Sequence, residues 1–353
     1  MKQHFVMIRV LHALLAGLLL FVGCKGTPSI VSGSDEERTQ MTQKPLSRGL
    51  PYELVLVIPR GLYTGELKDT LDAVLMGSTP VLPQHEPMFR LDVAFTDANL
   101  TPWRTFRNRL VVDVETGQGS AQMGVALDAV ARPQIEVKLT AATAHELAEF
   151  IGAQRQRLTD LIVDHELECE AASLRRTFSR MTADSLQRWG HTVCVPAGLR
   201  AAKVGRDFLW TGTNLNDKDQ NFVYYSYPWD GRPLTTERFV AAHDSVLRAN
   251  IPGARAGQWM QTARANAGKS GEPSETGRPL VIVRTRVINK KVVQQVHGLW
   301  ELRAGALGGP FVALERVDTA ACRVVVCEGF VYSPHSPKRD LLRQMEAALR
   351  TFE

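Results

Sequence analysis

The segment from 263 to 270 (ARANAGKS) carries the residue types of a phosphate-binding loop, with Ala in place of the first glycine. Such a loop binds phosphate because a preceding strand and a following helix direct backbone N–H groups toward the ligand. Polar residues at 261–262 precede the segment and Gly-Glu-Pro-Ser at 271–274 follows it, so we expect neither element. We therefore interpret the segment as part of a polar loop over 257–279, and we predict no nucleotide cofactor.

His165 and Cys169 lie one helical turn apart, a spacing that two ligands of one metal ion can have. They also continue the apolar stripe of Leu158 and Ile162, so a core histidine beside a core thiol explains the pattern without a metal. The chain has no Gly-x-Ser-x-Gly sequence and no Ser-x-x-Lys pair, which excludes the serine hydrolases that a short motif identifies. We predict no metal site, and the catalytic residues of any dispersed active site are unknown.

The N-terminal segment has the parts of an export signal. Lys2 and Arg9 supply a basic region, a leucine-rich apolar run covers 10–22, and Cys24 follows. The run is shorter than the ~20 apolar residues that span a bilayer. We therefore expect a signal peptide over residues 1–23 rather than a transmembrane helix.

The ending Phe21-Val-Gly-Cys24 resembles the bacterial lipobox, although Phe21 stands where leucine is usual. The resemblance implies that Cys24 is the lipid attachment site, because several acyl chains, palmitate among them, anchor a protein stably to a membrane. The alternative is an ordinary cleaved signal with an incidental cysteine. Lys25 gives no signal for inner-membrane retention, so we expect a cell-envelope protein on the outer membrane, facing the periplasm.

Residues 24–49, which begin with the lipidated cysteine, contain few apolar side chains and should form a flexible tether. The chain has 42 basic and 37 acidic side chains, and removal of Lys2 and Arg9 leaves a formal charge of +3. This charge is mild, and no run of Lys or Arg indicates a nucleic-acid surface. We therefore expect no nucleic-acid partner.

Four cysteines follow the anchor position: Cys169, Cys194, Cys322 and Cys327. An oxidising envelope permits disulfides, but four cysteines allow three pairings and the sequence does not choose among them. Cys322 and Cys327 lie five residues apart in a strand-like run, so their side chains should point to opposite faces. Buried free thiols are an equally good interpretation.

Hydrophobic periodicity predicts an α+β fold of two sheet-and-helix halves joined by a helical region. In the N-terminal half (50–142), strand patterns lie at 53–59, 89–95, 110–114 and 135–139, with a helix around 67–75. The helical connector (143–189) begins with a capping box of Thr143 and Glu146.

The C-terminal half (190–353) begins with three predicted strands, at 192–196, 208–211 and 222–227, followed by a helix around 239–247. Short turns between 280 and 332 predict a four-stranded antiparallel meander, in which Gly308-Gly-Pro310 is a turn. Ser336 and Pro337 predict the start of a terminal helix. Its apolar face of Leu342, Met345 and Leu349 should pack on the meander.

Several segments together resemble the Bacteroidetes lipoproteins grouped as domain-of-unknown-function family 4837. These are 132–140 (RPQIEVKLT), 297–300 (HGLW), 308–311 (GGPF), 328–334 (EGFVYSP) and 338–346 (KRDLLRQME). The resemblance covers nearly the whole chain after the signal peptide. It implies an envelope lipoprotein and no particular activity.

Asp-Thr and Asp-Ser pairs at Thr70, Ser185, Ser245 and Thr319 are similar to the short O-glycosylation motif of exported proteins in that phylum. Only Thr319 falls in a predicted turn, so Thr319 is the candidate glycosylation site.

The absence of a readable catalytic motif favours a non-enzymatic binding or assembly module of the envelope, with an envelope protein or a glycan as partner. The alternative is an envelope hydrolase with a dispersed catalytic site. A concave pocket holding side chains of perturbed pKa would favour the hydrolase. Shallow, extended grooves would favour binding.

Overall fold

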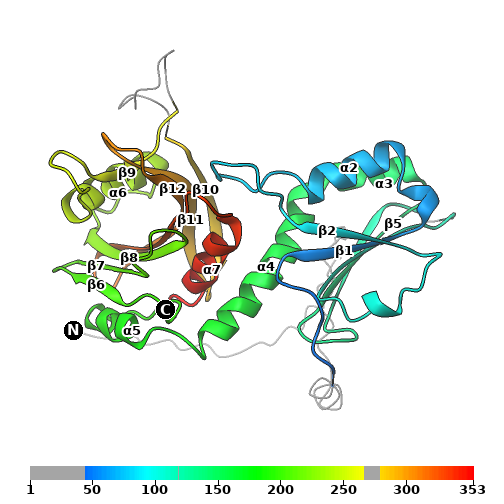
Figure 1. Cartoon of the computed structure of the whole chain (residues 1–353), viewed down its shortest axis with the longest axis horizontal. Coiled ribbons are helices and arrows are strands. Elements are labelled where there is room, and N and C mark those ends of the chain that lie inside the picture. The colour runs from blue at the N-terminus through cyan, green and yellow to red at the C-terminus, as the bar shows by residue number, and fades with distance from the viewer. Residues whose placement is uncertain (1–43, 118, 266–278) are drawn as a thin grey trace, which may run out of the picture.

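The computed structural model describes residues 44–117, 119–265 and 279–353. Figure 1 shows two lobes, each built around one β-sheet, with the long helix α4 (Arg155–Leu174) running between them. We call the part before α4 the N-terminal lobe and the part after it the C-terminal lobe. The mixture of two sheets with six α-helices confirms the predicted α+β class for the described residues.

The N-terminal lobe contains a five-stranded sheet in the order β2-β1-β3-β5-β4. Its strands are β1 (Glu53–Ile58), β2 (Arg90–Phe95), β3 (Asn108–Val114), β4 (Gln122–Leu127) and β5 (Ile135–Ala141). The first three and β5 are parallel, and β4 is antiparallel to β5. Because parallel sheets are covered on both faces, the interior strand β1 is a continuous apolar run in which Leu54 to Ile58 are all buried.

Two helices cover one face of this sheet. Helix α2 (Gly65–Leu75) buries Leu67, Leu71 and Leu75, as their spacing predicts. Helix α3 (Ala144–Ala153) begins at Thr143, whose side chain accepts a hydrogen bond from the Glu146 N–H. The Glu146 carboxylate in turn accepts from the Ala142 and Ala121 N–H groups. The predicted capping box therefore forms, with the reciprocal bond displaced by one residue.

The C-terminal lobe contains an eight-stranded antiparallel sheet in the order β10-β11-β12-β13-β8-β7-β6, with β9 paired to β11. The strands are β6 (Ala201–Val204), β7 (Phe208–Gly212), β8 (Asp219–Pro228), β9 (Met260–Thr262), β10 (Val281–Ile288), β11 (Lys291–Leu302), β12 (Gly308–Asp318) and β13 (Arg323–Tyr332). Helix α6 (Thr236–Asn250) covers one face, and helix α7 (Arg339–Leu349) covers the other.

Three sequence expectations for this lobe are wrong. Residues 192–196 are not a strand; they form an irregular segment that makes only an isolated bridge between Pro196 and Phe178. Gly308 to Pro310 are part of β12 and pair with β11. Residue 309 must be glycine, because a Cβ there would lie 2.1 Å from the Val331 carbonyl oxygen. Cys322 lies in the turn before β13 and not in the strand.

The predicted helical connector is broken into several pieces. After α4 come helix α5 (Arg180–Leu186) and the 3-10 helix η3 (Gln187–Trp189), which ends at Gly190 in the left-handed region. Two further 3-10 turns, η1 (Arg60–Leu62) and η2 (Thr101–Trp103), lie in the N-terminal lobe.

Helix α4 belongs to both hydrophobic cores. Leu158 and Ile162, in its first half, are buried in the core of the N-terminal lobe. Leu167 and Leu174, in its second half, are buried in the core of the C-terminal lobe. Val163 packs against both cores, so one continuous helix fixes the two sheets relative to each other.

Helix α7 joins the lobes a second time. Its apolar side chains, including Leu342, Met345 and Leu349, pack on the C-terminal sheet, as predicted. The helix begins at Arg339, two residues later than Pro337 suggested, because the Glu86 carboxylate of the N-terminal lobe accepts from the Lys338 and Arg339 N–H groups at 2.7 and 2.9 Å. A distant carboxylate therefore replaces the expected Ser336 cap.

The last residues of the expected tether contact the N-terminal lobe. The Lys44 ammonium donates to the Asp128 carbonyl at 2.6 Å, and the Ser47 N–H donates to the Arg132 carbonyl at 3.1 Å. Within the described ranges, no helix is both long enough and apolar enough to cross a membrane.

Candidate functional site

A cavity of about 80 Å³ opens between the two lobes. Its walls come from α4 and the loop before β2 on the N-terminal side, and from β10, β11 and α7 on the C-terminal side. This volume accommodates a few water molecules or one carboxylate or phosphate group. Side chains from five separate parts of the chain meet here, so we treat this interlobe cleft as the candidate site.

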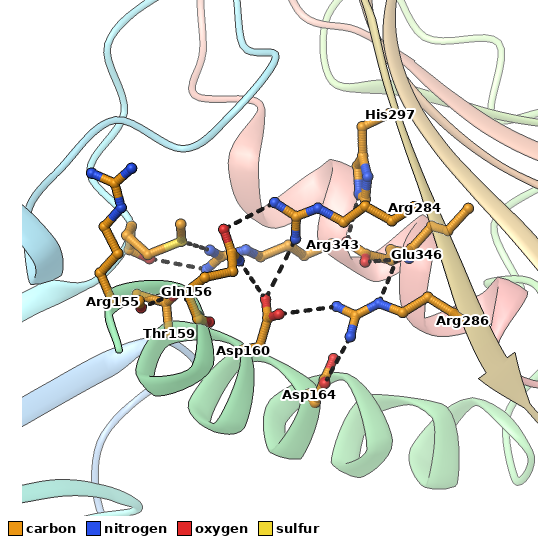
Figure 2. Close-up of polar contacts among 12 residues, drawn as sticks. Arg155, Gln156, Thr159, Asp160, Asp164, Arg284, Arg286, His297, Arg343 and Glu346 are labelled. Atoms are coloured by element: carbon orange, nitrogen blue, oxygen red, sulfur yellow. Dashed lines mark hydrogen bonds and ion pairs between the residues drawn. The ribbon is translucent and has the colours of Figure 1, made fainter. Parts of the chain in front are cut away.

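The acidic wall of the cleft is one face of α4. Gln156, Asp160 and Asp164 are spaced four residues apart, which places them on the same side of the helix. The Asp164 carboxylate is held by the Arg350 guanidinium, whereas Asp160 faces the opposite wall (Figure 2). Thr159, directly before Asp160, donates its hydroxyl to the Arg155 and Gln156 carbonyls and is not free to act as a nucleophile.

The basic wall is formed by Arg284 and Arg286 on β10. They are two residues apart, so both side chains leave the same face of the strand and reach toward α4 (Figure 2). Arg284 lies 3.6 Å from Asp160 and donates to the Gln156 side chain at 3.0 Å. Arg286 lies 3.5 Å from Asp160 and 3.7 Å from Asp164.

These three ion pairs are long. A charge-assisted N–H···O bond is typically about 2.7–2.9 Å, and none of the three reaches hydrogen-bond distance. The two guanidinium groups therefore share one carboxylate, Asp160, without saturating their donors. Each of the four side chains is about one third exposed, so a small ligand in solvent can reach them.

A buried chain of contacts behind the basic wall orients Arg286. Its Nε donates to the Gln295 side chain at 3.3 Å, and Gln295 donates to the Glu346 carboxylate at 2.8 Å. His297 lies 3.4 Å from the other Glu346 oxygen. Burial alone would raise the pKa of Glu346, but His297, Arg350 and Arg343 outweigh it and lower the pKa to about 2. Glu346 therefore stays ionised and acts as an anchor.

The remaining arginines of the cleft are already engaged. Arg343 donates to the Met88 carbonyl at 3.1 Å and lies 4.1 Å from the centre of the Tyr52 ring. Arg339 donates to the Pro87 carbonyl at 2.5 Å and to Asp340 at 2.8 Å. These contacts hold α7 against the N-terminal lobe, which leaves Arg284 and Arg286 as the donors with spare capacity.

A second polar cluster lies sealed beneath α6. His243 is completely buried, with its Nε2 3.1 Å from Glu328 and its Nδ1 3.0 Å from the Thr262 hydroxyl. Burial alone would lower the pKa of His243, but Glu328 and Asp244 outweigh it and raise the pKa to about 9.

A buried carboxyl of the kind that general acids use, Glu315, accepts a hydrogen bond from Tyr227. Burial raises the pKa of Glu315, and the hydrogen bond from Tyr227 and the charge of Arg238 offset only part of this effect. Glu315, Glu328 and His243 have no exposed surface, however, so no substrate reaches them in this conformation. His243 and Glu315 therefore lie outside the cleft, where the carboxyl of perturbed pKa is Glu346, which is held ionised.

The candidate site residues chosen from the sequence fall outside the cleft, although the segments 297–300 and 338–346, quoted for the family resemblance, contribute His297 and Glu346 to its lining. Cys24 lies outside the described residues, and so does the Gly-Lys-Ser end of the phosphate-loop-like segment at 268–270. A short strand, β9, does precede that segment, contrary to expectation, but it is antiparallel to β11. Thr319 lies in the exposed turn between β12 and β13, where the Asp318 carboxylate accepts from the Ala320 and Ala321 N–H groups.

The cysteines and the His165–Cys169 pair also lie elsewhere. All four described cysteines are free thiols. The Cys169 sulfur is 3.6 Å from the His165 ring, and burial raises the pKa of Cys169 to about 11 and lowers that of His165. Among the described residues, no three His, Cys, Asp or Glu side chains are arranged to hold a metal ion.

Sequence reasoning missed the charged side chains that α4 and β10 contribute to the cleft, although a weak signal was present. Arg284 and Arg286 interrupt an otherwise apolar strand, VIVRTRVI, on one face. Asp160 and Asp164 have the matching spacing on a helix. Neither pattern alone shows that the two faces meet, because that depends on how α4 is shared between the lobes.

Two family models match the chain. Residues 47–175 match a domain of unknown function, DUF8532. Residues 179–351 match another domain of unknown function, DUF4837, so the resemblance is confirmed over a narrower range than expected and does not include 132–140. None of the curated proteins compared with the chain matches it significantly. The C-terminal part of this chain, residues 179–351, therefore belongs to the DUF4837 family.

Proposed function

We propose that this protein is a lipid-anchored, non-enzymatic binding module of the cell envelope, and that its interlobe cleft binds the oxyanion group of a ligand. The observation that carries the proposal is the pair of guanidinium groups, Arg284 and Arg286, which share the Asp160 carboxylate at 3.5–3.6 Å. A carboxylate or phosphate that replaces Asp160 between them gains short, bidentate hydrogen bonds.

The ligand class follows from the size and charge of the cleft. The cavity of about 80 Å³ accepts one oxyanion group. An open hollow of about 490 Å³ adjoins it at Asp160, Asp164 and Arg286 and offers space for the rest of the ligand. An acidic side chain of an envelope protein and an acidic sugar of an envelope glycan both offer such a group. The sealing of Glu315 and His243 under α6 favours binding over the alternative, a hydrolase.

The proposal also includes the location of the protein and its covalent modifications. Cys24 carries the lipid, the protein faces the periplasm from the outer membrane, and Thr319 carries an O-glycan. The exposed position of Thr319 in a turn supports the last of these, because a glycosyltransferase needs an accessible hydroxyl. No nucleic-acid partner is proposed.

The test of anion binding in the cleft depends on competition between the added anion and the Asp160 carboxylate for Arg284 and Arg286. Calorimetric titration with inorganic phosphate and with succinate should show saturable binding to the unmodified chain. The double substitution Arg284→Gln/Arg286→Gln should weaken binding at least about tenfold, since hydrogen bonds to charged groups contribute about 1.5–3 kcal/mol each. Asp160→Asn should strengthen binding about tenfold, because it removes the competing carboxylate.

The double arginine variant should bind the anions more weakly and Asp160→Asn more tightly. A general loosening of the contact between the lobes would instead weaken binding in all variants alike. Arg155→Gln, at an exposed arginine whose side chain does not line the cavity, is the matched control and should leave the affinity unchanged. A preference for phosphate or for succinate distinguishes the two ligand chemistries. Loss of affinity in Asp160→Asn would show that the cleft is only an interlobe contact.

A further inference from the structure

The positive charge of this chain is concentrated in one short segment. Residues 175–206 contain seven basic side chains and one acidic side chain, Asp184, a net charge of +6. The whole chain has a net charge of +5, so everything outside the segment is close to neutral. The mild overall charge therefore hides a strong local asymmetry.

Folding gathers the segment on one side of the C-terminal lobe. It begins at Arg175, directly after α4, and comprises α5, η3 and β6, at the lower left of Figure 1. The Ser179 N–H donates to the Val195 carbonyl at 2.9 Å, and the Trp189 indole donates to the Arg206 carbonyl at 3.1 Å. These bonds hold the first and last parts of the segment side by side.

All seven basic side chains are exposed. Lys203 reaches toward α6, where its ammonium donates to the Asn250 carbonyl at 2.6 Å. We call the other six the basic surface: Arg175, Arg176, Arg180, Arg188, Arg200 and Arg206. Within the described part of the chain, none of them forms an ion pair, whereas Arg284, Arg286 and Arg350 all do. Asp207, the nearest acid along the chain, is bound to Arg323 at 3.1 Å. The charge of the basic surface is therefore not neutralised by the protein itself.

Apolar side chains are exposed among these charges. Met181, on α5, is 40% exposed, and Val204, on β6, is 44% exposed. Cationic side chains interleaved with exposed apolar ones are typical of surfaces that lie on a membrane, where the apolar groups enter the headgroup layer. A cluster of roughly four to eight Lys and Arg is the pattern that attracts anionic lipids.

We propose that the basic surface docks on the anionic phospholipid headgroups of the membrane. This docking rests on the proposed lipid anchor, which brings the folded part close to a bilayer. Docking would in addition fix the orientation of the folded part relative to the membrane. Asp160 in the cleft is fifteen residues from Arg175 along α4, or about 22 Å at the helical rise. The cleft can therefore remain accessible while the basic surface contacts lipid.

Vesicle binding by the unlipidated chain tests the proposal. The chain from residue 25 onward retains every described residue and lacks the anchor. It should co-sediment with vesicles of phosphatidylglycerol mixed with phosphatidylcholine, and not with phosphatidylcholine alone, and high salt should abolish binding. The triple variant Arg175→Gln/Arg180→Gln/Arg200→Gln should weaken binding on the order of 100-fold.

The matched control replaces three exposed arginines elsewhere, Arg104→Gln/Arg157→Gln/Arg255→Gln, and should bind as the unmodified chain does. Equal losses in the two triple variants would overturn the proposal, and so would binding to duplex DNA without binding to vesicles. The anchor is tested separately by lipid labelling of Cys24. A failure of vesicle binding with successful lipid labelling would contradict the docking proposal alone. Vesicle binding without lipid labelling would contradict the anchor alone.

Discussion

Protonation of His243 should make the free energy of unfolding of the C-terminal lobe depend on pH. Its pKa rises from about 6.5 in the unfolded chain to about 9 in the folded one. A raised pKa means that the stabilisation is fully present below pH ~6.5 and is lost as the pH rises toward 9. We expect the free energy of unfolding to fall by about 3 kcal/mol over this interval.

Urea unfolding at pH 6 and pH 9 measures this difference, and His243→Gln should remove most of it. His145 is a suitable control because it is exposed and paired with the exposed Glu66. His145→Gln should retain the pH dependence. A His243→Gln protein with an unchanged slope would mean that the imidazole is neutral in the fold.

The sequence shows the type of each residue but not the partner that decides its role. Spacing predicted that His165 and Cys169 continue the apolar stripe of α4, but both are only half-buried and Glu166 and Leu167 are the buried residues of that turn. The charged residues of the cleft were not predictable, because Arg284 and Asp160 are 124 positions apart and meet only after both lobes have formed. The sealed pair of His243 and Glu328 is hidden for the same reason.

At the scale of elements, α7 depends on a carboxylate from the other lobe. Glu86→Ala removes the two hydrogen bonds to the Lys338 and Arg339 N–H groups and should cost about 1 kcal/mol, the usual contribution of a helix cap. Chemical unfolding measures the change. Glu149→Ala, at a carboxylate that is 68% exposed, should change stability by less than about 0.5 kcal/mol. Equal effects of the two substitutions would contradict the capping role of Glu86.

Local patterns predicted most elements correctly where local interactions decide them. The apolar stripe of α7, the helix α2 and the four-stranded meander follow directly from periodicity. The predictions failed where a distant group intervenes: Glu86 replaces the Ser336 cap, and pairing with Trp300 of β11 places Gly309 in β12. The irregular segment 192–196 has strand-forming residues but is held by the C-terminal end of the chain, since Thr192 exchanges backbone hydrogen bonds with Glu353.

At the scale of the whole molecule, the proposed anchor and the basic surface should act with different sensitivities to salt. The native chain should remain with membranes after a high-salt wash, because lipid insertion is not screened. Replacement of residues 1–24 by a signal that is cleaved without lipidation should release the protein in the same wash. Fractionation and labelling with palmitate measure both. Membrane retention of the unlipidated protein at high salt would contradict anchoring through Cys24.

Because α4 contributes to the cores of both lobes, the two matched domains cannot simply be separated into two chains. The DUF8532 match ends at residue 175 and the DUF4837 match begins at 179, so the boundary falls just after α4. Leu167 and Leu174 nevertheless complete the core of the second lobe. A gene split at that boundary would leave the second lobe with an open apolar groove. Any chain that carries the DUF4837 unit alone must therefore supply a substitute helix, either from a different neighbour or from a partner protein.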